Sequence, residues 1–365
     1  MSNIDNEKIN AQNTSVRSTG KKKNGTGNKT GRENILKTRN LLKHAGLFIL
    51  ILIFMISLTA CSINAKNEST VKETNKTENA EYPLKIKDAK GFEVEIKEKP
   101  NKIVSLTLTT DEILLSLIDK SRIAALSHLS EDPGLSNVTE EAKEIPVKAK
   151  LEIETLVAMQ PDLIIVSDWT DEKAVQQLRD ANIAVYALAT SDTIDEVKES
   201  IVTIARIVDE EEKGQELISW MDEKLKNVEE KIKTLKDEEK VRVLSCDSFF
   251  YTYGKGTTFD DIAKHAGVIN IASEQGLEMW QEISKEKIIE WNPDVIFLPS
   301  WSYEGFDAEK FTEEFKNDKS LAVVNAIKNN RVYNIPDAHM MTTSQYIVLA
   351  VEDVAKAAYP QLFDK

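Results

Sequence analysis

One phrase occurs twice in this chain, and it constrains the fold more than any other feature. The first copy, ETLVAMQPDLIIVSDW, runs from Glu154 to Trp169, and the second, EKIIEWNPDVIFLPSW, runs from Glu286 to Trp301. A Glu, a Pro-Asp pair, a run of aliphatic residues and a Trp recur at one constant offset. Chance readily supplies a Pro-Asp pair and an aliphatic run, but it rarely adds a framing Glu and Trp in register. The repeat therefore predicts two lobes of one design that face each other.

Segments typical of strands and helices alternate around both copies of the phrase. In the first half we expect a hairpin over 84–96, strands at 102–106, 122–126, 163–166 and 184–189, and helices at 111–118, 173–181 and 194–208. In the second half we expect strands at 240–244, 295–298 and 331–335, and helices at 259–265, 311–315, 322–328 and 344–358. Buried strands that alternate with helices form parallel sheets through right-handed connections. The pattern predicts an α/β fold of two lobes with mainly parallel sheets.

A long amphipathic helix is expected between the lobes, within residues 209–240. Its apolar positions follow one another at steps of three or four, which is the spacing of a single helical stripe: Leu217, Met221, Leu225, Val228, Ile232 and Leu235. A helix of about 28 residues would span roughly 42 Å, enough to connect two lobes. We therefore expect lobes at 83–208 and 241–365, with the alternative that the stripe packs in a coiled coil.

Charge is divided unevenly along the chain. The 365 residues carry −14 in total, and since residues 1–60 carry +7, the remainder carries −21. The strong negative charge of residues 61–365 argues against a nucleic-acid partner and favours solubility. The two cysteines exclude a disulfide framework, and the four histidines show no metal-ligand spacing. We expect no catalytic residues, no metal site and no resident cofactor.

The N-terminal region has the pattern of an exported, membrane-attached protein. Residues 1–45 are polar and basic, and an apolar run follows at 45–58, short for a spanning helix but fitting a signal peptide. The run ends in Leu58-Thr59-Ala60-Cys61, which resembles the lipobox of bacterial lipoproteins, where the peptide is cut before a Cys that is lipidated. The alternative is an uncleaved anchor with an incidental Cys. We expect residues 1–60 to be leader and signal peptide, and residues 61–82 a flexible tether.

A ligand site is expected where the strands of the two sheets end. Ligands of parallel α/β sheets bind beyond the carboxyl ends of the strands, and here those ends are rich in aromatic and hydroxyl side chains. Two matched sets of loops predict a cleft between the lobes that holds a bulky, partly apolar ligand. The candidate ligand-binding residues are Thr109, Thr110, His128, Trp169, Phe249, Tyr251, Tyr253, Trp280, Trp301, Asp337, His339 and Met340.

Glu154 and Glu286 stand apart from these aromatic loops. Each begins the short helix that leads into its Pro-Asp strand, so both carboxylates should lie on the cleft side of their lobes. A Glu at a helix N-terminus is already favoured by the helix dipole. A symmetric pair of acidic side chains also suits docking to basic sockets on a two-fold partner.

Several of these segments together resemble the class III periplasmic binding proteins. Residues 100–106, PNKIVSL, followed by 110–114, TDEIL, are similar to the family's opening, and both copies of the repeated phrase and the ending RVYNIP…VEDVAKAAYP also fit. The resemblance extends from about Pro83 to the end. It implies a substrate-binding component of an ABC importer for iron–siderophore, haem or cobalamin, with two lobes joined by one long helix that move little on binding.

The resemblance also implies roles for single residues. Glu154 and Glu286 match the positions that pair with arginines of the permease. Residues 280–286, WQEISKE, resemble a Trp-bearing segment of the cobalamin binder, and Trp280 and Asp337 fall on cleft positions of that relative. The chain departs from the family where His128 replaces an aromatic residue. No Arg pair for a catecholate or hydroxamate ligand occurs in the predicted loops.

The leading prediction is a lipid-anchored receptor outside the cytoplasmic membrane. It would capture an iron–siderophore chelate and deliver it to an ABC permease dimer and its ATPase. Cobalamin is an alternative ligand because of Trp280 and the aromatic loops. Haem is another, since His128 in one lobe and His339, Met340 or Met341 in the other would serve as axial ligands.

The sequence also bears on two other classes of function. For an enzyme, residues 254–258, GKGTT, fail as a phosphate-binding loop because Phe249 stands where the first Gly is required. No nucleophile elbow or metalloprotease motif occurs, and Cys246 is expected to be inert. A surface interaction protein without a small ligand would suit the tether but would not require duplicated lobes.

Overall fold

The computed structural model describes residues 81–363 of the chain. The predicted leader, signal peptide and lipidated Cys61 lie outside the described residues. The described residues all belong to one compact unit. Among the helices described, none is long and apolar enough to cross a membrane.

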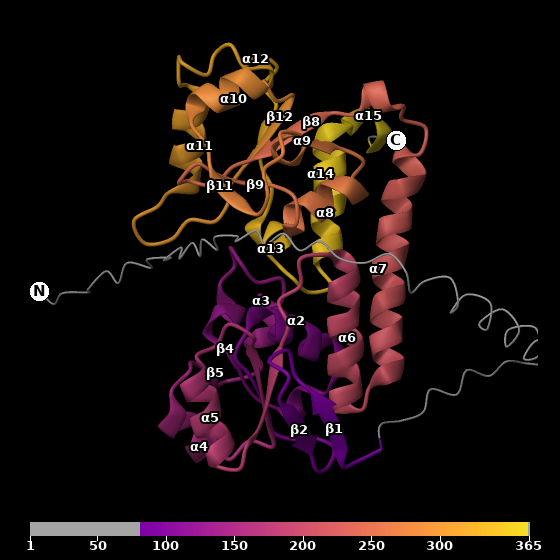
Figure 1. Ribbon diagram of the computed structural model, residues 1–365, viewed down its shortest axis with the longest axis vertical. Coiled ribbons are helices and arrows are strands. Elements are labelled where there is room, and N and C mark those ends of the chain that lie inside the picture. Colours follow the sequence, from indigo (N-terminus) through magenta and orange to yellow (C-terminus); the bar gives the residue numbers. More distant parts are fainter. Residues whose placement is uncertain (1–80, 364–365) are drawn as a thin grey trace, which may run out of the picture. The chain divides into compact units, whose positions relative to one another are not determined.

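The first half of the described chain is built on a five-stranded sheet in the order β5-β4-β3-β6-β7, whose paired strands are parallel (Figure 1). A separate antiparallel hairpin, β1–β2, precedes it and turns at Gly91, whose φ is +79°. The elements are β1 (Leu84–Lys87), β2 (Glu93–Ile96), β3 (Ile103–Ser105), α2 (Leu108–Leu117), η1 (Lys120–Arg122), β4 (Ile123–Ser127), η2 (His128–Glu131), α3 (Thr139–Ala142), β5 (Lys148–Ala149), α4 (Ile153–Met159), β6 (Leu163–Ser167), α5 (Glu172–Asp180), β7 (Ala184–Leu188) and α6 (Ile194–Val208).

The second half follows the helix α7 (Glu211–Ile232) and forms a four-stranded parallel sheet in the order β10-β8-β12-β13. Its remaining elements are η3 (Asp237–Glu239), β8 (Arg242–Ser245), β9 (Tyr251–Tyr253), α8 (Thr258–His265), β10 (Ile269–Asn270), α9 (Ile271–Glu274), β11 (Trp280–Glu282), α10 (Lys285–Trp291), β12 (Val295–Leu298), α11 (Ala308–Lys316), α12 (Asn325–Lys328), β13 (Val332–Asn334), α13 (Asp337–Met340), α14 (Ile347–Ala358) and α15 (Pro360–Phe363). The predicted α/β fold of two lobes with parallel sheets is confirmed.

The repeated phrase forms the same structure in both lobes. Helices α4 and α10 each end at a left-handed residue, Gln160 with φ 49° and Asn292 with φ 48°, and a Pro follows. The repeated Asp then joins its strand to the neighbouring one. The Asp162 carboxylate accepts from the amide of Asn101, just before β3, and the Asp294 carboxylate accepts from the amide of Arg242 in β8. The strands β6 and β12 occupy matching places in the two sheets.

Helix α7 confirms the predicted connection between the lobes, although it is shorter than expected. Its 22 residues span about 33 Å. The helix ends at Ile232, and the chain from Lys233 to Lys240 forms a turn and a short 3₁₀ segment. Near its beginning, Gly214 lies so close to α6 that an added Cβ would be 2.5 Å from the Ala205 methyl group. Near its end, Ile232 fills the space above Gly267 of the second lobe.

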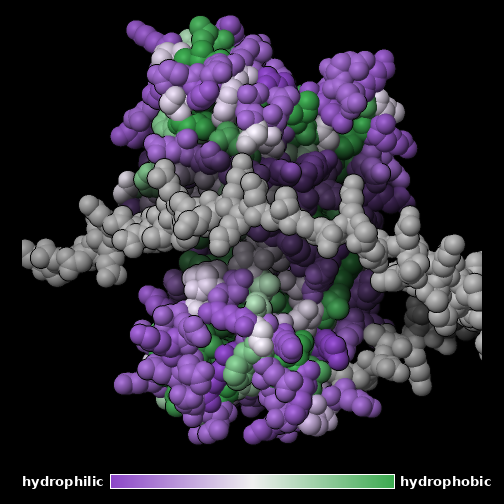
Figure 2. All heavy atoms as spheres, viewed as in Figure 1, coloured by the Kyte–Doolittle hydropathy of each residue, from purple (hydrophilic) through white to green (hydrophobic). Residues whose placement is uncertain are grey.

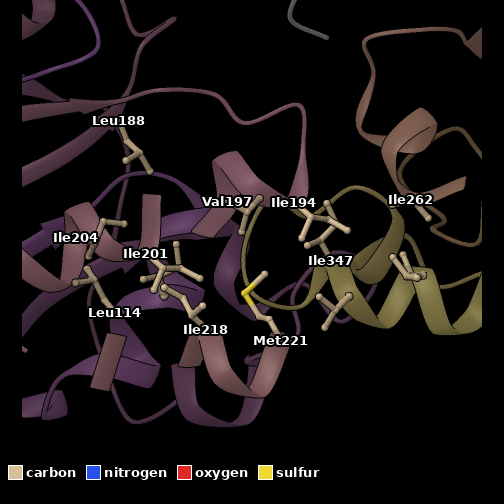
Figure 3. Packing of buried hydrophobic residues seen from close by; sticks show 14 of the residues in the cluster. Leu114, Leu188, Ile194, Val197, Ile201, Ile204, Ile218, Met221, Ile262 and Ile347 are labelled. Atoms are coloured by element: carbon tan, nitrogen blue, oxygen red, sulfur yellow. The ribbon is translucent and has the colours of Figure 1, made fainter. Parts of the chain in front are cut away.

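One apolar core runs through both lobes. Figure 3 shows Met221 of α7 among side chains of α6 and α14, with Ile201 on one side and Ile347 on the other. The buried hydrophobic residues of α2, α6, α7, α8 and α14 belong to this single cluster. Each sheet has a second, smaller cluster on its other face. The shared core favours the intramolecular connection over a coiled-coil partner for α7.

The visible surface of both lobes is mainly hydrophilic. Figure 2 shows hydrophilic residues over most of the face in view, with smaller hydrophobic areas between them. This distribution agrees with the acidic, highly charged composition of the chain outside residues 1–60. It leaves the ligand site to be identified from its geometry.

The structure differs from the expected elements at two places near strand ends. Helix α2 was expected at 111–118 but begins at Leu108: Thr107 is its N-cap and accepts a hydrogen bond from the Thr110 amide. No strand was expected between 244 and 295, but Tyr251–Tyr253 form β9, which pairs antiparallel with β11. A three-residue strand carries almost no periodic signal, and its partner lies far along the sequence.

Helix α2 carries two adjacent carboxylates that have no exposed surface, Asp111 and Glu112. Asp111 accepts hydrogen bonds from the backbone amide of Ser127, at 3.0 Å to Oδ1, and from the Ser127 hydroxyl. Burial raises the pKa of Asp111 from 3.8 to about 7, and the hydrogen bonds from Ser105 and Ser127 only partly oppose this effect. The folded protein therefore retains a proton here that the unfolded chain has already released.

We predict a pH-dependent difference in stability between wild type and Asp111→Asn. Because the folded pKa is raised, the contribution of Asp111 is fully present below pH 4 and is lost as the pH rises towards 7. The free energy of unfolding of wild type should therefore fall relative to the Asn variant by up to about 4 kcal/mol over this range. Urea denaturation at several pH values measures the difference. If the difference in the free energy of unfolding between the two proteins does not change with pH, the prediction is contradicted.

Candidate functional site

A cavity of about 460 Å³ lies at the carboxyl ends of strands β8, β12 and β13. This is the edge of a parallel sheet at which ligands bind, and the volume lies within the usual range for small-molecule sites. All of the described residues that line it come from the second lobe: Ser245, Cys246, Asp247, Tyr251, Tyr253, Thr257, Thr258, Phe259, Trp280, Phe297, Leu298, Pro299, Ile335, Asp337, Met340 and Met341.

The β9–β11 pair carries the aromatic wall of this cavity. Trp280 lies directly opposite Tyr253 in the antiparallel register, so the two rings are cross-strand neighbours. Gly254 permits the close approach that follows, because an added Cβ would meet the backbone oxygen of Leu277 at 2.2 Å. The GKGTT segment is thus a turn that joins β9 to α8, where Thr257 caps the helix by accepting from the Asp260 amide.

Asp337 is the most closely held polar group of the cavity. Its Oδ2 atom accepts from the backbone amides of Ser300 at 2.8 Å and Trp301 at 2.7 Å. All of the hydrogen bonds that the described residues donate to this carboxylate reach Oδ2, which leaves Oδ1 available to a ligand. Burial raises the pKa of Asp337, and the amides of Trp301 and Ser300 oppose the effect. The group is therefore a fixed acceptor at the mouth of an apolar cavity.

Two other titratable groups in the cavity stay uncharged near neutral pH. Burial, reinforced by Asp247, raises the pKa of the Tyr253 phenol and that of the Cys246 thiol far above neutrality. A buried thiol in this state is not a nucleophile, which agrees with the expectation that Cys246 is inert. The phenol of Tyr253 is available as a hydrogen-bond donor.

The charge of the cavity limits what can bind there. Its described lining residues include two carboxylates, Asp247 and Asp337, and no Lys, Arg or His. An anion would have to leave water for a site without a counter-charge, which is costly. The aromatic walls, hydroxyl donors and free carboxylate oxygen instead suit a bulky ligand that is neutral or cationic and has a large apolar face.

The structure brings five of the twelve candidate ligand-binding residues into this cavity: Tyr251, Tyr253, Trp280, Asp337 and Met340. Among the other second-lobe candidates, Phe249 is 68% exposed outside the lining. Trp301 packs against Tyr303, with a ring-centre separation of 4.9 Å, and lies over Gly134 of the first lobe. His339 pairs through Nδ1 with the Asp353 carboxylate at 2.6 Å.

The first-lobe candidates do not line the cavity. Thr110 is fully buried and bonds to Ser105 and Thr107 within its own lobe. Thr109 makes a contact between the lobes, with its hydroxyl 2.6 Å from that of Thr343. His128 is exposed, and Trp169 is 79% exposed. These positions were assigned from strand ends alone, which specify the edge of a sheet but not the direction of a side chain.

Sequence reasoning missed several lining residues. Thr257, Thr258 and Phe259 lie at the start of α8, and the cap pattern of Thr257 would have indicated a helix terminus beside a strand end. Phe297, Leu298 and Pro299 belong to the repeated phrase and were not among the candidate residues. In residues 81–363 there is no group of three or more His, Cys, Asp or Glu residues placed to hold a metal ion.

Glu154 and Glu286 occupy the same position on equivalent helices. Each is the second residue of its helix, α4 or α10, and both side chains are exposed. A hydrogen bond from the Ser284 side chain, together with one from its own backbone amide, lowers the pKa of Glu286. Neither residue lines the cavity. The arrangement provides one exposed acidic side chain on each lobe.

Comparison with known proteins places this geometry in context. The sequence model of the periplasmic binding protein family matches residues 103–338, which include both sheets and most of the cavity. The chain is 29% identical over 327 residues to the ABC transporter substrate-binding lipoprotein YvrC of Bacillus subtilis, covering 88% of this chain and 99% of that protein. It is 25% identical to the iron-uptake system-binding protein of the same organism, covering 78% of this chain and 88% of that protein.

A solved structure supports the same fold. The molybdate-binding protein MolA of Haemophilus influenzae, determined with molybdate bound, superposes with a TM-score of 0.65 at 23% sequence identity. The match covers 77% of this chain and 93% of MolA. At this identity the likeness establishes the two-lobed architecture alone.

Proposed function

The chain belongs to the periplasmic binding protein family, and we propose that it captures an iron–siderophore chelate that has no net negative charge. As a member of this family it is a substrate-binding protein of an ABC importer and not an enzyme. The single observation that carries the choice of ligand is the cavity of the second lobe, which combines aromatic walls with two carboxylates and no basic described residue.

The charge of a ferric chelate depends on its coordinating groups. Three singly charged hydroxamates neutralise ferric iron, whereas three doubly charged catecholates leave a trianion. A neutral hydroxamate complex presents oxygen atoms that the Tyr253 phenol and the Thr258 hydroxyl are placed to bond. Its chelator backbone or amine supplies N–H groups for the free oxygen of Asp337. No arginine pair is needed for a ligand of this kind.

The first test is calorimetric titration with a panel of defined complexes. Ferrichrome, which is neutral, and ferrioxamine B, which is cationic, should bind. Ferric enterobactin, haemin and molybdate should not bind, because each brings negative charge to the two carboxylates. Binding restricted to these anionic compounds would overturn the proposal.

Cobalamin is a second candidate, favoured by one specific observation. Trp280 and Asp337, the two residues on which the resemblance to a cobalamin binder rests, both line the cavity. A corrin with its nucleotide is larger than either hydroxamate complex of the panel, so its binding would require more of the first lobe. Cyanocobalamin in the same panel distinguishes the candidates: binding of it alone would replace the siderophore assignment.

The aromatic wall should contribute directly to affinity. Trp280 is 62% exposed in the absence of ligand, so Trp280→Ala should leave the fold intact. We predict that it weakens binding of the panel's tightest ligand about tenfold, on the order of 1.4 kcal/mol. Phe249→Ala is the matched control, because it removes an equally exposed ring outside the lining. Equal affinities for the two variants would argue against this cavity as the site.

We further propose that Glu154 and Glu286 dock the protein onto the permease. Reversing both charges with Glu154→Lys and Glu286→Lys should leave ligand affinity unchanged and abolish uptake by intact cells, since neither residue lines the cavity. Glu172→Lys, an exposed acidic residue in the first turn of α5, is the control and should preserve uptake. If ligand affinity and uptake are lost together, the two residues are structural rather than docking groups.

We also propose that Cys61 carries a lipid that holds the protein at the outer face of the cytoplasmic membrane. The lipobox-like sequence and the similarity to a substrate-binding lipoprotein support this location. Cys61→Ala should shift the chain from the membrane fraction to the soluble fraction, as judged by immunoblotting of fractionated cells. Cys246→Ala changes the other cysteine and should leave the distribution unaltered. Retention of the Cys61 variant in the membrane would point to an uncleaved anchor.

A further inference from the structure

We propose that Glu112 is a positioning residue for the ligand cavity, although it does not line it. It connects α2 of the first lobe to residues 337–345 of the second lobe and thereby holds α13, the helix that presents Asp337 and Met340 to the ligand. The inference rests on the function proposed above, because it concerns how the residues of that ligand site are held in position.

The Glu112 carboxylate is fully buried and receives donors from both lobes. Its Oε1 atom accepts from the backbone amide and the side-chain amide of Asn137 in the first lobe, both at 2.9 Å. Its Oε2 atom accepts from the hydroxyl of Thr342 at 2.7 Å and from that of Ser344, both in the second lobe. One side chain therefore satisfies four donors across the boundary between the lobes.

Neighbouring hydrogen bonds extend this connection, which we call the interlobe seam. The side chain of Gln345 donates to the backbone oxygen of Glu112 at 2.9 Å. The side-chain amide of Asn137, which also donates to the Glu112 carboxylate, donates to the backbone oxygen of Ala338 at 2.7 Å. Ala338 lies within α13, between Asp337 and Met340. The carboxylate of Glu112 is thus one side chain away from the helix that forms a wall of the cavity.

Helix α13 depends on such support because of its length. It contains four residues, and the chain from Met341 to Tyr346 that follows it is irregular. A single turn of helix is not stable by itself. Figure 1 shows α13 between the two lobes, above α2 and α3. Its position is therefore set by the contacts that it makes across the seam.

A general loss of stability must be separated from a loss of positioning. Glu112→Ala would remove the acceptor of four donor groups, and it lowers stability in either case. Glu112→Gln keeps an acceptor for the Asn137 groups and turns an amide towards the Thr342 and Ser344 hydroxyls, whose oxygens are able to accept. Leu178→Ala is the matched control, because this fully buried residue packs in an apolar cluster of the first lobe that does not include α2.

The first readout is independent of any ligand. In α13 the amides of His339 and Met340 donate to the oxygen of Pro336, and that of Met341 donates to the oxygen of Asp337. Hydrogen exchange of these three amides in the purified full-length chain should accelerate at least about tenfold in Glu112→Ala. It should stay near the wild-type rate in Glu112→Gln and in Leu178→Ala. Unchanged exchange in Glu112→Ala would overturn the inference.

The second readout is affinity for the panel member that wild type binds most tightly. Glu112→Ala and the milder variant Asn137→Ala should weaken binding about tenfold or more, while Glu112→Gln restores it to within about threefold and Leu178→Ala leaves it unchanged. Equal weakening by Leu178→Ala would mean that the effect is one of stability alone, and would overturn the inference. If wild type binds no member of the panel, the proposed function fails and the exchange rates still decide the role of Glu112.

Discussion

The architecture depends on the packing of α7 against both lobes. Its apolar stripe contacts α6 on one side and α14 on the other, so that residues from the two halves of the chain share one core around Met221 and Val228. Separating the lobes would expose this core to water, and exposing apolar surface to water is strongly unfavourable. The burial of apolar surface that stabilises each lobe therefore also sets the relative position of the two sheets. A rigid connection of this kind suits a receptor that presents a bound ligand to a membrane partner.

Burial shifts the pKa of two kinds of carboxylate: those of helix α2 and that of Asp337 at the cavity. On α2, Glu112 lies in the interlobe seam and satisfies donors from Asn137 and the second lobe, whereas Asp111 satisfies donors from Ser127 within the first lobe. The carboxylate of Asp337 lies at the cavity, held through one oxygen only. Burial raises the pKa of all three groups. The three groups differ in their hydrogen bonds. Both oxygens of Asp111 and of Glu112 accept hydrogen bonds within the protein, whereas the described residues donate only to Oδ2 of Asp337.

Much of the fold followed from local patterns. The helix Ile194–Val208 and the hairpin of β1 and β2 were predicted within a residue or two, because amphipathic periodicity and a Gly turn are strong local signals. The candidate site was predicted only in part. Tyr251, Tyr253 and Trp280 reach the cavity because β9 pairs with β11, a contact between short segments that no periodicity indicates. Trp169 and His128 also follow strands, yet they are exposed, because the end of a strand does not determine where a side chain points.

The sequence by itself determined the duplicated α/β design. A Glu at the start of a helix, a Pro-Asp pair and an aliphatic strand recur in register. Such elements depend mainly on interactions between residues that are close in the sequence. Only the tertiary structure decided that the cavity is lined by one lobe, that the repeated Asp caps a neighbouring strand, and that Glu112 joins the two halves. The physical reason is that burial and hydrogen-bond satisfaction depend on residues distant in the chain. The repeated phrase indicates two lobes of one design, whereas in the structure the described lining of the cavity comes from the second lobe.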